Sequence, residues 1–215
     1  MTTTKIRHEE AIKRRGSDEP DSQRRLRESV SSVLGEGVEA QPPLAWEYGA
    51  CFQIRPAVLA KEEGVRSLFK VLRDHERFMF NMLIDVTAVD WMDRREPRFE
   101  VVYQLLSLTH NHRLCIKAQL PEERPEIESI RPLWPAANFL EREVWDMYGV
   151  QFKGHGDQRR ILMYDEFVGH PLRKDYPIRG KQPRLQLRVP ELRNTSDDMN
   201  RGDLVSLPTR GRGRV

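Results

Sequence analysis

The residues best suited to chemistry lie close together, between Glu141 and Leu162. This stretch, EREVWDMYGVQFKGHGDQRRIL, contains paired carboxylates, a histidine and paired arginines. Two carboxylates on one surface could act as general acid and general base. Glu141 and Glu143 are two positions apart, however, and on a helix their side chains diverge by about 200°. They cannot serve one site, and we expect no catalytic residue in this chain.

Four histidines could be metal ligands, but none occurs in an HExxH pattern or has a cysteine as companion. His110 and His112 lie in an expected hairpin turn, where we expect them to face solvent. For His155 and His170 we expect hydrogen bonds to irregular backbone instead of metal. The sequence therefore predicts no metal-binding residue.

The chain has two cysteines, Cys51 and Cys115, and neither belongs to a CxxC motif. This excludes a disulfide framework, a zinc site and an iron–sulfur site built from cysteines, and it favours a reduced, cytosolic setting. The sequence also has no GxSxG motif and no glycine-rich phosphate loop. We therefore expect no cofactor-binding residue.

The stretch WPAANFLEREVWDMYG, residues 134–149, is predicted to be a helix. Pro135 suits the first turn of a helix, and Gly149 suits the position just past its end. At 100° per residue, five apolar side chains share one face: Ala137, Leu140, Val144, Met147 and Tyr148.

The opposite face of this helix mixes polar and aromatic residues. Arg142 and Asp146 are spaced for an i,i+4 ion pair. Phe139 lies in the middle of this polar face and Trp145 at its edge, while Glu141 falls at an apolar position. We therefore expect the helix to be covered on both sides, by its own sheet and by a partner.

Periodicity elsewhere indicates helices at 21–34 and within 59–75, with Val65, Leu68, Val71 and Leu72 on one face of the second. Strands are predicted within 45–56, 80–91, 98–108 and 112–121. The order of these elements suggests an α+β fold, a two-layer domain with a mixed or antiparallel sheet and helices on one face. An extended C-terminal arm is expected to follow it.

Charge is unevenly distributed along a chain whose net charge is only +3. Residues 153–188 contain nine bases and four acids, a balance of +5, with several prolines and little periodicity. We expect a disordered N-terminus at 1–20, the α+β domain at 21–153, an extended basic partner-binding arm at 154–188 and a flexible tail at 189–215. No apolar run is long enough to span a bilayer.

Several of these motifs together resemble a known family. EREVWDMYGVQFKGH, the following RRIL, and GHPLRKDYP at 169–177 are similar to the 30-kilodalton (C) subunit family of bacterial NADH-quinone oxidoreductase, respiratory complex I. The likeness extends upstream through FNMLIDVTAVDW and covers about residues 50–180. The family usually has proline after the motif's histidine, whereas this chain has Gly156, which loosens the turn.

The resemblance implies a structural subunit of the hydrophilic arm with no cofactor of its own. FMN, iron–sulfur clusters and quinone are expected in partner subunits, and the large quinone-site subunit (49 kDa type) is the expected neighbour, with other hydrophilic-arm subunits. The complex would place this chain peripherally on the cytoplasmic face of the bacterial inner membrane, with membrane contact only through the complex. Enzyme activity, as an NADH:quinone oxidoreductase and translocase, would belong to the assembly.

The resemblance also implies roles for residues of the motifs. Those that organise the exit from the domain would be Glu141, Arg142, Glu143, Asp146, His155, Arg159 and Arg160. Those that hold the neighbouring subunit would be Arg173, Lys174, Asp175 and Tyr176, and His170 is a further structural or interface residue.

Two alternatives stay open at this point. A homologous subunit of a membrane-bound nickel-iron hydrogenase or a formate-linked complex would have the same motifs, because the cysteines that bind nickel would lie in its partner. A free-standing basic protein that binds nucleic acid is disfavoured, since the sequence has no RNP motif, helix-turn-helix signal or zinc-finger spacing.

Overall fold

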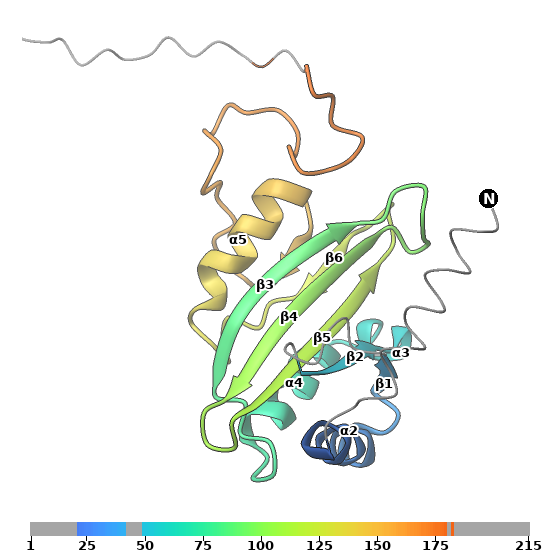
Figure 1. The fold of residues 1–215 in the computed structure, drawn as a ribbon. Coiled ribbons are helices and arrows are strands. Elements are labelled where there is room, and N and C mark those ends of the chain that lie inside the picture. Colours follow the sequence, from blue (N-terminus) through green and yellow to red (C-terminus); the bar gives the residue numbers. More distant parts are fainter. Residues whose placement is uncertain (1–20, 42–48, 180–181, 183–215) are drawn as a thin grey trace, which may run out of the picture. The chain divides into compact units, whose positions relative to one another are not determined.

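A computed structural model describes residues 21–41, 49–179 and 182 (Figure 1). The elements in chain order are α2 (Asp21–Leu34), β1 (Val38–Gln41), β2 (Ala50–Ile54), α3 (Pro56–Leu59), α4 (Gly64–Asp74), β3 (Met82–Asp90), β4 (Phe99–Ser107), β5 (His112–Leu120), β6 (Glu126–Glu128), α5 (Ala137–Tyr148) and β7 (Gln151–Lys153). The predicted N-terminal disorder and the C-terminal tail from residue 189 lie outside the described residues. No described helix is long and apolar enough to cross a membrane.

The main sheet has five strands in the order β1-β2-β5-β4-β3. The pairs β3–β4, β4–β5 and β1–β2 are antiparallel, whereas β2 and β5 run parallel, so the sheet is mixed. In strand β5, Leu114, Ile116, Ala118 and Leu120 are all buried, and Cys115 is buried on the other face. A second, two-stranded parallel sheet joins β6 to β7. The short strands β1, β6 and β7 were not predicted.

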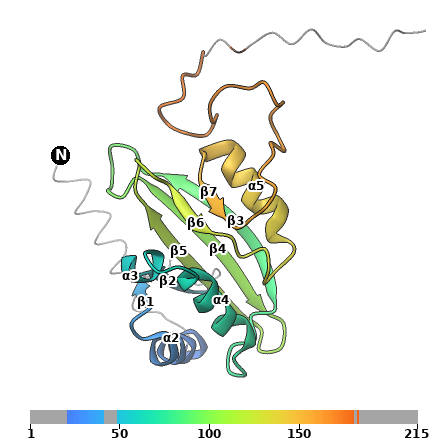
Figure 2. The ribbon, with the colours of Figure 1, turned by 180° about the vertical axis from the view of Figure 1, so that it is seen from behind.

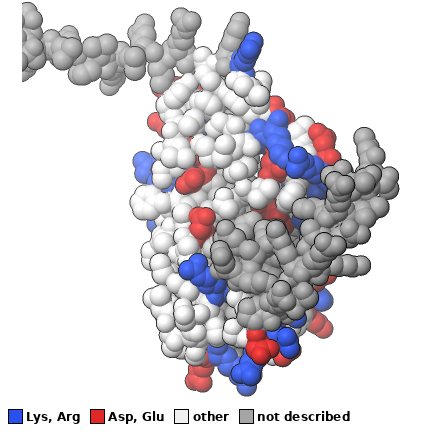
Figure 3. All heavy atoms as spheres, viewed as in Figure 1, with Lys and Arg blue, Asp and Glu red and all other residues white. Residues whose placement is uncertain are grey.

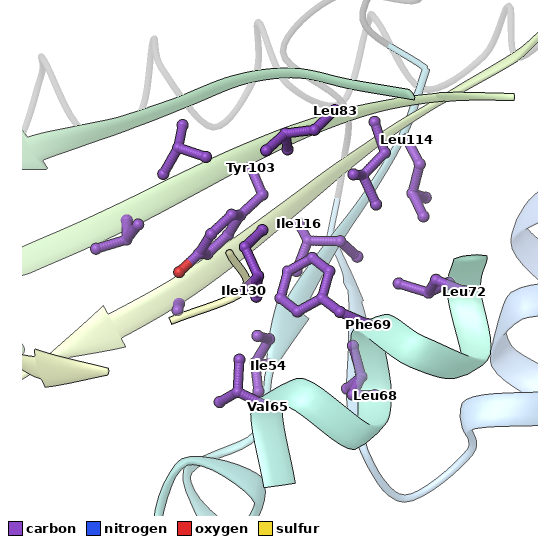
Figure 4. Close-up of a cluster of buried hydrophobic side chains, with 14 of the residues drawn as sticks. Ile54, Val65, Leu68, Phe69, Leu72, Leu83, Tyr103, Leu114, Ile116 and Ile130 are labelled. Atoms are coloured by element: carbon purple, nitrogen blue, oxygen red, sulfur yellow. The ribbon is translucent and has the colours of Figure 1, made fainter. Parts of the chain in front are cut away.

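Helices cover one face of the main sheet, and Figure 2 shows α4 in front of the strands. Buried side chains of α2, α4 and α5 belong to the same apolar cluster as alternate residues of the strands. Figure 4 shows Tyr103 and Ile116 pointing from the sheet toward Phe69 of α4, and the Phe69 and Tyr103 ring centroids are 4.8 Å apart. The fold is therefore α+β with a mixed sheet and helices on one face, as predicted.

One detail of the predicted core face of α4 was wrong. Val71 is 37% exposed, whereas Phe69, which the prediction left out, is fully buried against the sheet. Both positions lie at the edges of the apolar stripe, so periodicity alone could not choose between them. Burial of the larger aromatic side chain contributes more, about 1.5–3 kcal/mol relative to exposure.

Helix α5 ends as the sequence predicted. Gly149 has φ 79° at the C-cap, and its amide donates to the carbonyl of Trp145. A Cβ at this position would lie 2.7 Å from the His170 ring, so the glycine also permits the later chain to approach closely. Gly156 has φ 85°, a value that proline cannot adopt because its ring fixes φ near −65°. The backbone here is therefore one that the family's usual proline would not allow.

Residues 154–179 contain no helix or strand, but they do not extend away from the domain. The described residues up to Arg179 belong to one compact unit. The segment was expected to be an arm ordered only by a partner, and this expectation needs correction for its described part. The physical reason is a set of buried carboxylates in the domain whose hydrogen-bond partners lie in this segment.

Candidate functional site

Asp146, on α5, organises the chain that follows the helix. Its side chain is fully buried and accepts hydrogen bonds from the amides of Ile161, Leu162 and Met163, at 3.1, 2.9 and 2.9 Å. The guanidinium of Arg160 completes this shell with an ion pair. Burial acts to raise the pKa of Asp146, but these hydrogen bonds together hold it below its ordinary value. The carboxylate is therefore ionised and fully occupied within this chain.

Arg160 links the helix to a more distant turn of the same segment. Besides Asp146, it donates to the carbonyls of Phe167 and Gly169, at 2.8 and 3.0 Å. Its guanidinium carbon lies 5.8 Å from the centre of the Trp145 ring and 5.5 Å from that of Phe167. The planar guanidinium donates hydrogen bonds along its edge and lies against aromatic rings with its faces. The ammonium group of a lysine could not make both kinds of contact.

The predicted ion pair between Arg142 and Asp146 does not form. Arg142 instead donates to the carbonyls of Arg159 and Arg160, both at 3.1 Å. The spacing would permit the pair, but the folded-back segment offers Asp146 a closer arginine and three amides. The sequence thus identified the correct carboxylate and the wrong partner.

His170 and Leu172 attach the segment to the end of α5. The His170 Nδ1 lies 3.0 Å from the carbonyl of Asp146, so this nitrogen donates, and burial lowers the pKa of the ring. The amide of Leu172 donates to the carbonyl of Met147 at 3.1 Å. His170 thus binds backbone, as the sequence predicted, but the carbonyl is one at the end of helix α5 and does not belong to an irregular segment.

A second buried cluster holds residues 173–176 and was not predicted. Arg98, only 5% exposed, forms paired hydrogen bonds of 2.9 and 2.8 Å with Asp90 and a 3.1 Å ion pair with Asp175. The amide of Lys174 donates to Asp90 at 2.8 Å. Burial acts to raise the pKa of Asp90, but these bonds hold it well below its usual range. Arg173 stacks over Phe99, with 4.9 Å from guanidinium carbon to ring centre.

Some residues of this stretch, which were expected to contact a partner, also have contacts inside the chain. Asp175 binds Arg98, and the Tyr176 ring stacks on Phe167 with centroids 5.9 Å apart. The Lys174 side chain is exposed. No sequence signal pointed to Arg98, which comes just before β4 and meets Asp90, at the end of β3, because these two strands pair.

Glu141 lies at the apolar position that the helix pattern gave it, fully buried. It accepts from the Ser129 hydroxyl at 2.6 Å and from the amide of Ile130 at 2.8 Å. Burial raises the pKa of Glu141 to about 7, although both hydrogen bonds oppose the shift. The carboxyl joins the β6–α5 connection to the helix and has no solvent access for substrate.

His155 is 1% exposed and lies beside this carboxyl, with its Nε2 3.9 Å from Glu141. The ring binds backbone on both sides, with Nε2 3.1 Å from the carbonyl of Asn138 and Nδ1 accepting from the amide of Asp157. Glu143 is exposed, and Arg159 pairs with Asp157 at the surface. Within the described part of the chain, no three histidine, cysteine or acidic residues are placed to hold a metal ion.

The outer side of this region exposes apolar side chains. We call this set the apolar surface: Phe139 (59% exposed), Ile161 (37%), Leu162 (55%), Val168 (66%), Leu172 (52%) and Ile178 (102%). Figure 3 shows that the upper part of the molecule, over the segment after α5, is mostly free of acidic and basic side chains. Of these residues, the sequence predicted only Phe139 to lie away from the core, on the polar face of its helix. The others lie in an irregular segment, where no periodicity indicates which side chains are exposed.

Residues 58–182 match the family described as "Respiratory-chain NADH dehydrogenase, 30 Kd subunit". The chain belongs to this 30 kDa subunit family. The match includes α4, α5, the main sheet from β3 to β5 and the folded-back segment. The shells of Asp146 and Asp90 therefore lie within the part shared with the 30 kDa family.

Individual relatives agree. The C subunit of the NADH-quinone oxidoreductase of Geobacter sulfurreducens is 46% identical over 129 residues, which cover 60% of this chain and 78% of the relative. The protein of the same name from Roseiflexus sp. (strain RS-1) is 43% identical over 152 residues, covering 71% and 87%. Among solved structures, a chain of the membrane-bound sulfane sulfur reductase, an archaeal respiratory membrane complex, has a TM-score of 0.54 at 22% identity. It covers 70% of this chain and 85% of that one, and the likeness is one of fold.

Proposed function

We propose that this chain is a non-catalytic structural subunit of the hydrophilic arm of a proton-translocating NADH-quinone oxidoreductase. Its place in the 30 kDa family and the names of its relatives support the assembly. The internal use of the buried ionisable groups supports the structural role. Asp146, Arg160, Asp90 and Arg98 are all saturated by contacts within the chain, and Glu141 is closed off from solvent.

The observation that carries the proposal is the apolar surface. Exposed apolar side chains that gather in one region can mark an interaction site, and five of these six belong to a segment that two ionic clusters hold in place. We propose that it packs against the large quinone-site subunit of the 49 kDa type. A surface already fixed in the free chain loses little conformational entropy on docking, so its contacts stabilise the complex more fully.

The proposal assigns no flavin, metal ion, iron–sulfur cluster or quinone to this chain, and places these groups in partner subunits. The chain would then be held peripherally at the cytoplasmic face of the inner membrane through its partners alone. The absorption spectrum and metal content of the purified chain test this part. A visible absorption band or stoichiometric metal would contradict it.

The docking proposal is tested by purification of tagged chain from native membranes. Leu162→Asp should reduce recovery of the large subunit at least about tenfold, since it forces a charge into the apolar contact. Leu108→Asp is a matched control, because Leu108 is 64% exposed and lies in the β4–β5 turn, which Figures 1 and 2 show at the end of the sheet away from the segment after α5. Equal recovery with both variants would refute docking through this surface. The chains recovered with the wild type also separate an NADH-quinone oxidoreductase from a hydrogenase or formate-linked assembly.

A further inference from the structure

The two cysteines of the chain, far apart in sequence, lie directly opposite each other in the sheet. Cys51 on β2 and Cys115 on β5 are register partners in the parallel pair. Neighbouring strands lie about 4.8 Å apart, which falls inside the range of about 4.4–6.8 Å between Cα atoms that a disulfide requires. Their spacing in the sequence does not indicate this proximity, because only the β2–β5 pairing brings the two thiols together.

Both side chains also point the same way. With Val102 they form a small cluster separate from the main core, against which Val89 packs. Cys51 is 2% exposed and Cys115 is 4% exposed, and both are free thiols. The two thiols are close enough for each to shift the pKa of the other. The strand register therefore places the two thiols side by side on one face of the sheet.

The thiols are not equivalent. The pKa of Cys51 is lowered, first by the hydrogen bond from the Cys115 thiol and also by the charge of Lys117, while burial and Glu100 oppose the shift. The pKa of Cys115 is raised, because its proton is held between the two sulfurs in a buried site. Cys51 is thus the better nucleophile, and Cys115 is placed to react second.

We propose that Cys51 and Cys115 are a peroxide-sensitive pair that closes to an intramolecular disulfide between β2 and β5. The Cys51 thiolate attacks one oxygen of hydrogen peroxide, and the O–O bond breaks to give a Cys51 sulfenic acid and hydroxide, which takes up the proton that Cys51 had released. The Cys115 sulfur then attacks the Cys51 sulfur, displaces its oxygen and loses its own proton, so a second water forms. Two thiols are oxidised by two electrons and one peroxide is reduced to two waters. A peroxide is small enough to reach thiols that exclude larger oxidants.

The position of the bond decides its effect. Strand β2 joins β1 to the rest of the sheet, and its pairing with β5 is the parallel one. A covalent bond here would fasten the β1–β2 hairpin to the central strands. Because the pair lies outside the main core cluster, closure leaves the packing beneath the helices in place.

The test uses the purified full chain, reduced and then exposed to hydrogen peroxide. Since the chain has only two cysteines, one bond can form within it. We expect a mass lower by about 2 Da, loss of both alkylation sites under denaturing conditions and their return after reduction, and a Cys51–Cys115 linked peptide. Amide exchange in β2 should slow upon oxidation. Neither the linked peptide nor the slower exchange should appear in Cys51→Ser or Cys115→Ser.

A second experiment compares the two single variants and tests which thiol reacts with peroxide first. In Cys115→Ser, dimedone should trap a Cys51 sulfenic acid, because no second thiol resolves it, and Cys51→Ser should give at least about tenfold less adduct at Cys115. Thiols that stay fully alkylatable after peroxide would overturn the proposal, as would oxidation to sulfinic acid without a bond or disulfides only between chains. Equal dimedone labelling of the two variants would overturn the assigned order of attack.

Discussion

Replacement of Asp146 by asparagine should release the segment that carries the apolar surface. The asparagine keeps the size of the side chain and one oxygen for the amides of residues 161–163, which all donate to the same Oδ2, but it replaces the Oδ1 that faces Arg160 with an NH2 group. It also removes the charge that pairs with Arg160, whose side chain is only 12% exposed. Breaking a buried ion pair costs about 3–5 kcal/mol. Arg160 retains the carbonyls of Phe167 and Gly169, so we expect the lower end, about 3 kcal/mol.

That loss is a large part of the total stability of a domain, about 5–15 kcal/mol. In urea, with a slope of about 2 kcal/mol per molar, the unfolding midpoint of Asp146→Asn should fall by about 1–2 M. Trypsin should also cleave after Arg159, Arg160 and Arg173 faster in the folded variant than in the wild type, because the segment is no longer held.

Asp157→Asn is the matched control. It makes the same substitution in the same segment, but Asp157 pairs with Arg159 at the surface, where their side chains are 40% and 75% exposed. Solvent screens such pairs, so we expect no resolved change in midpoint or cleavage. The account of the segment would be refuted if Asp146→Asn matched this control in both assays.

Three further predictions concern the same region. Arg160→Ala should lower the free energy of unfolding by about 3–5 kcal/mol, since it leaves a buried carboxylate unpaired. Arg142→Ala, which loses two hydrogen bonds to carbonyls, should lower it by about 1 kcal/mol. Equal losses in urea unfolding would contradict the assignment of Arg160 as the partner of Asp146. Because burial raises the pKa of Glu141 from 4.5 to about 7, the folded state binds more protons between these values. Stability should therefore fall by about 3 kcal/mol as pH rises through this window, and Glu141→Gln should abolish that fall; the same pH slope in both proteins would refute it. Asp90→Asn should accelerate tryptic cleavage after Lys174, whose amide Asp90 holds, and unchanged cleavage would show that this contact is dispensable.

The sequence predicted the elements whose signals are local. Helix α5 was predicted with its glycine stop, strand β5 within 112–121, and Glu141 with its apolar position. A mixed or antiparallel sheet with one helix-covered face also followed from the order of elements. Strand β1 was missed because four residues carry too little pattern, and at the edge of the α4 stripe periodicity could not separate Val71 from Phe69.

The candidate site depended on contacts between residues distant in the chain. Spacing on α5 offered Arg142 to Asp146, but the folded chain supplies Arg160 and three backbone amides instead. Nothing local marks Arg98 as the partner of Asp90 and Asp175, or Cys51 as the neighbour of Cys115. These pairings depend on how the strands pair and on the folding back of residues 154–179 onto the domain. Periodicity in the sequence indicates neither.

The central claim, that the apolar surface is a contact with the large quinone-site subunit, is tested most directly by a photo-crosslinking amino acid at position 162 in the native complex. Irradiation and mass spectrometry should identify one major adduct, with the large subunit, and the same amino acid at position 108 should give none with that subunit. Adducts absent at position 162, or formed equally from both positions, would contradict the account.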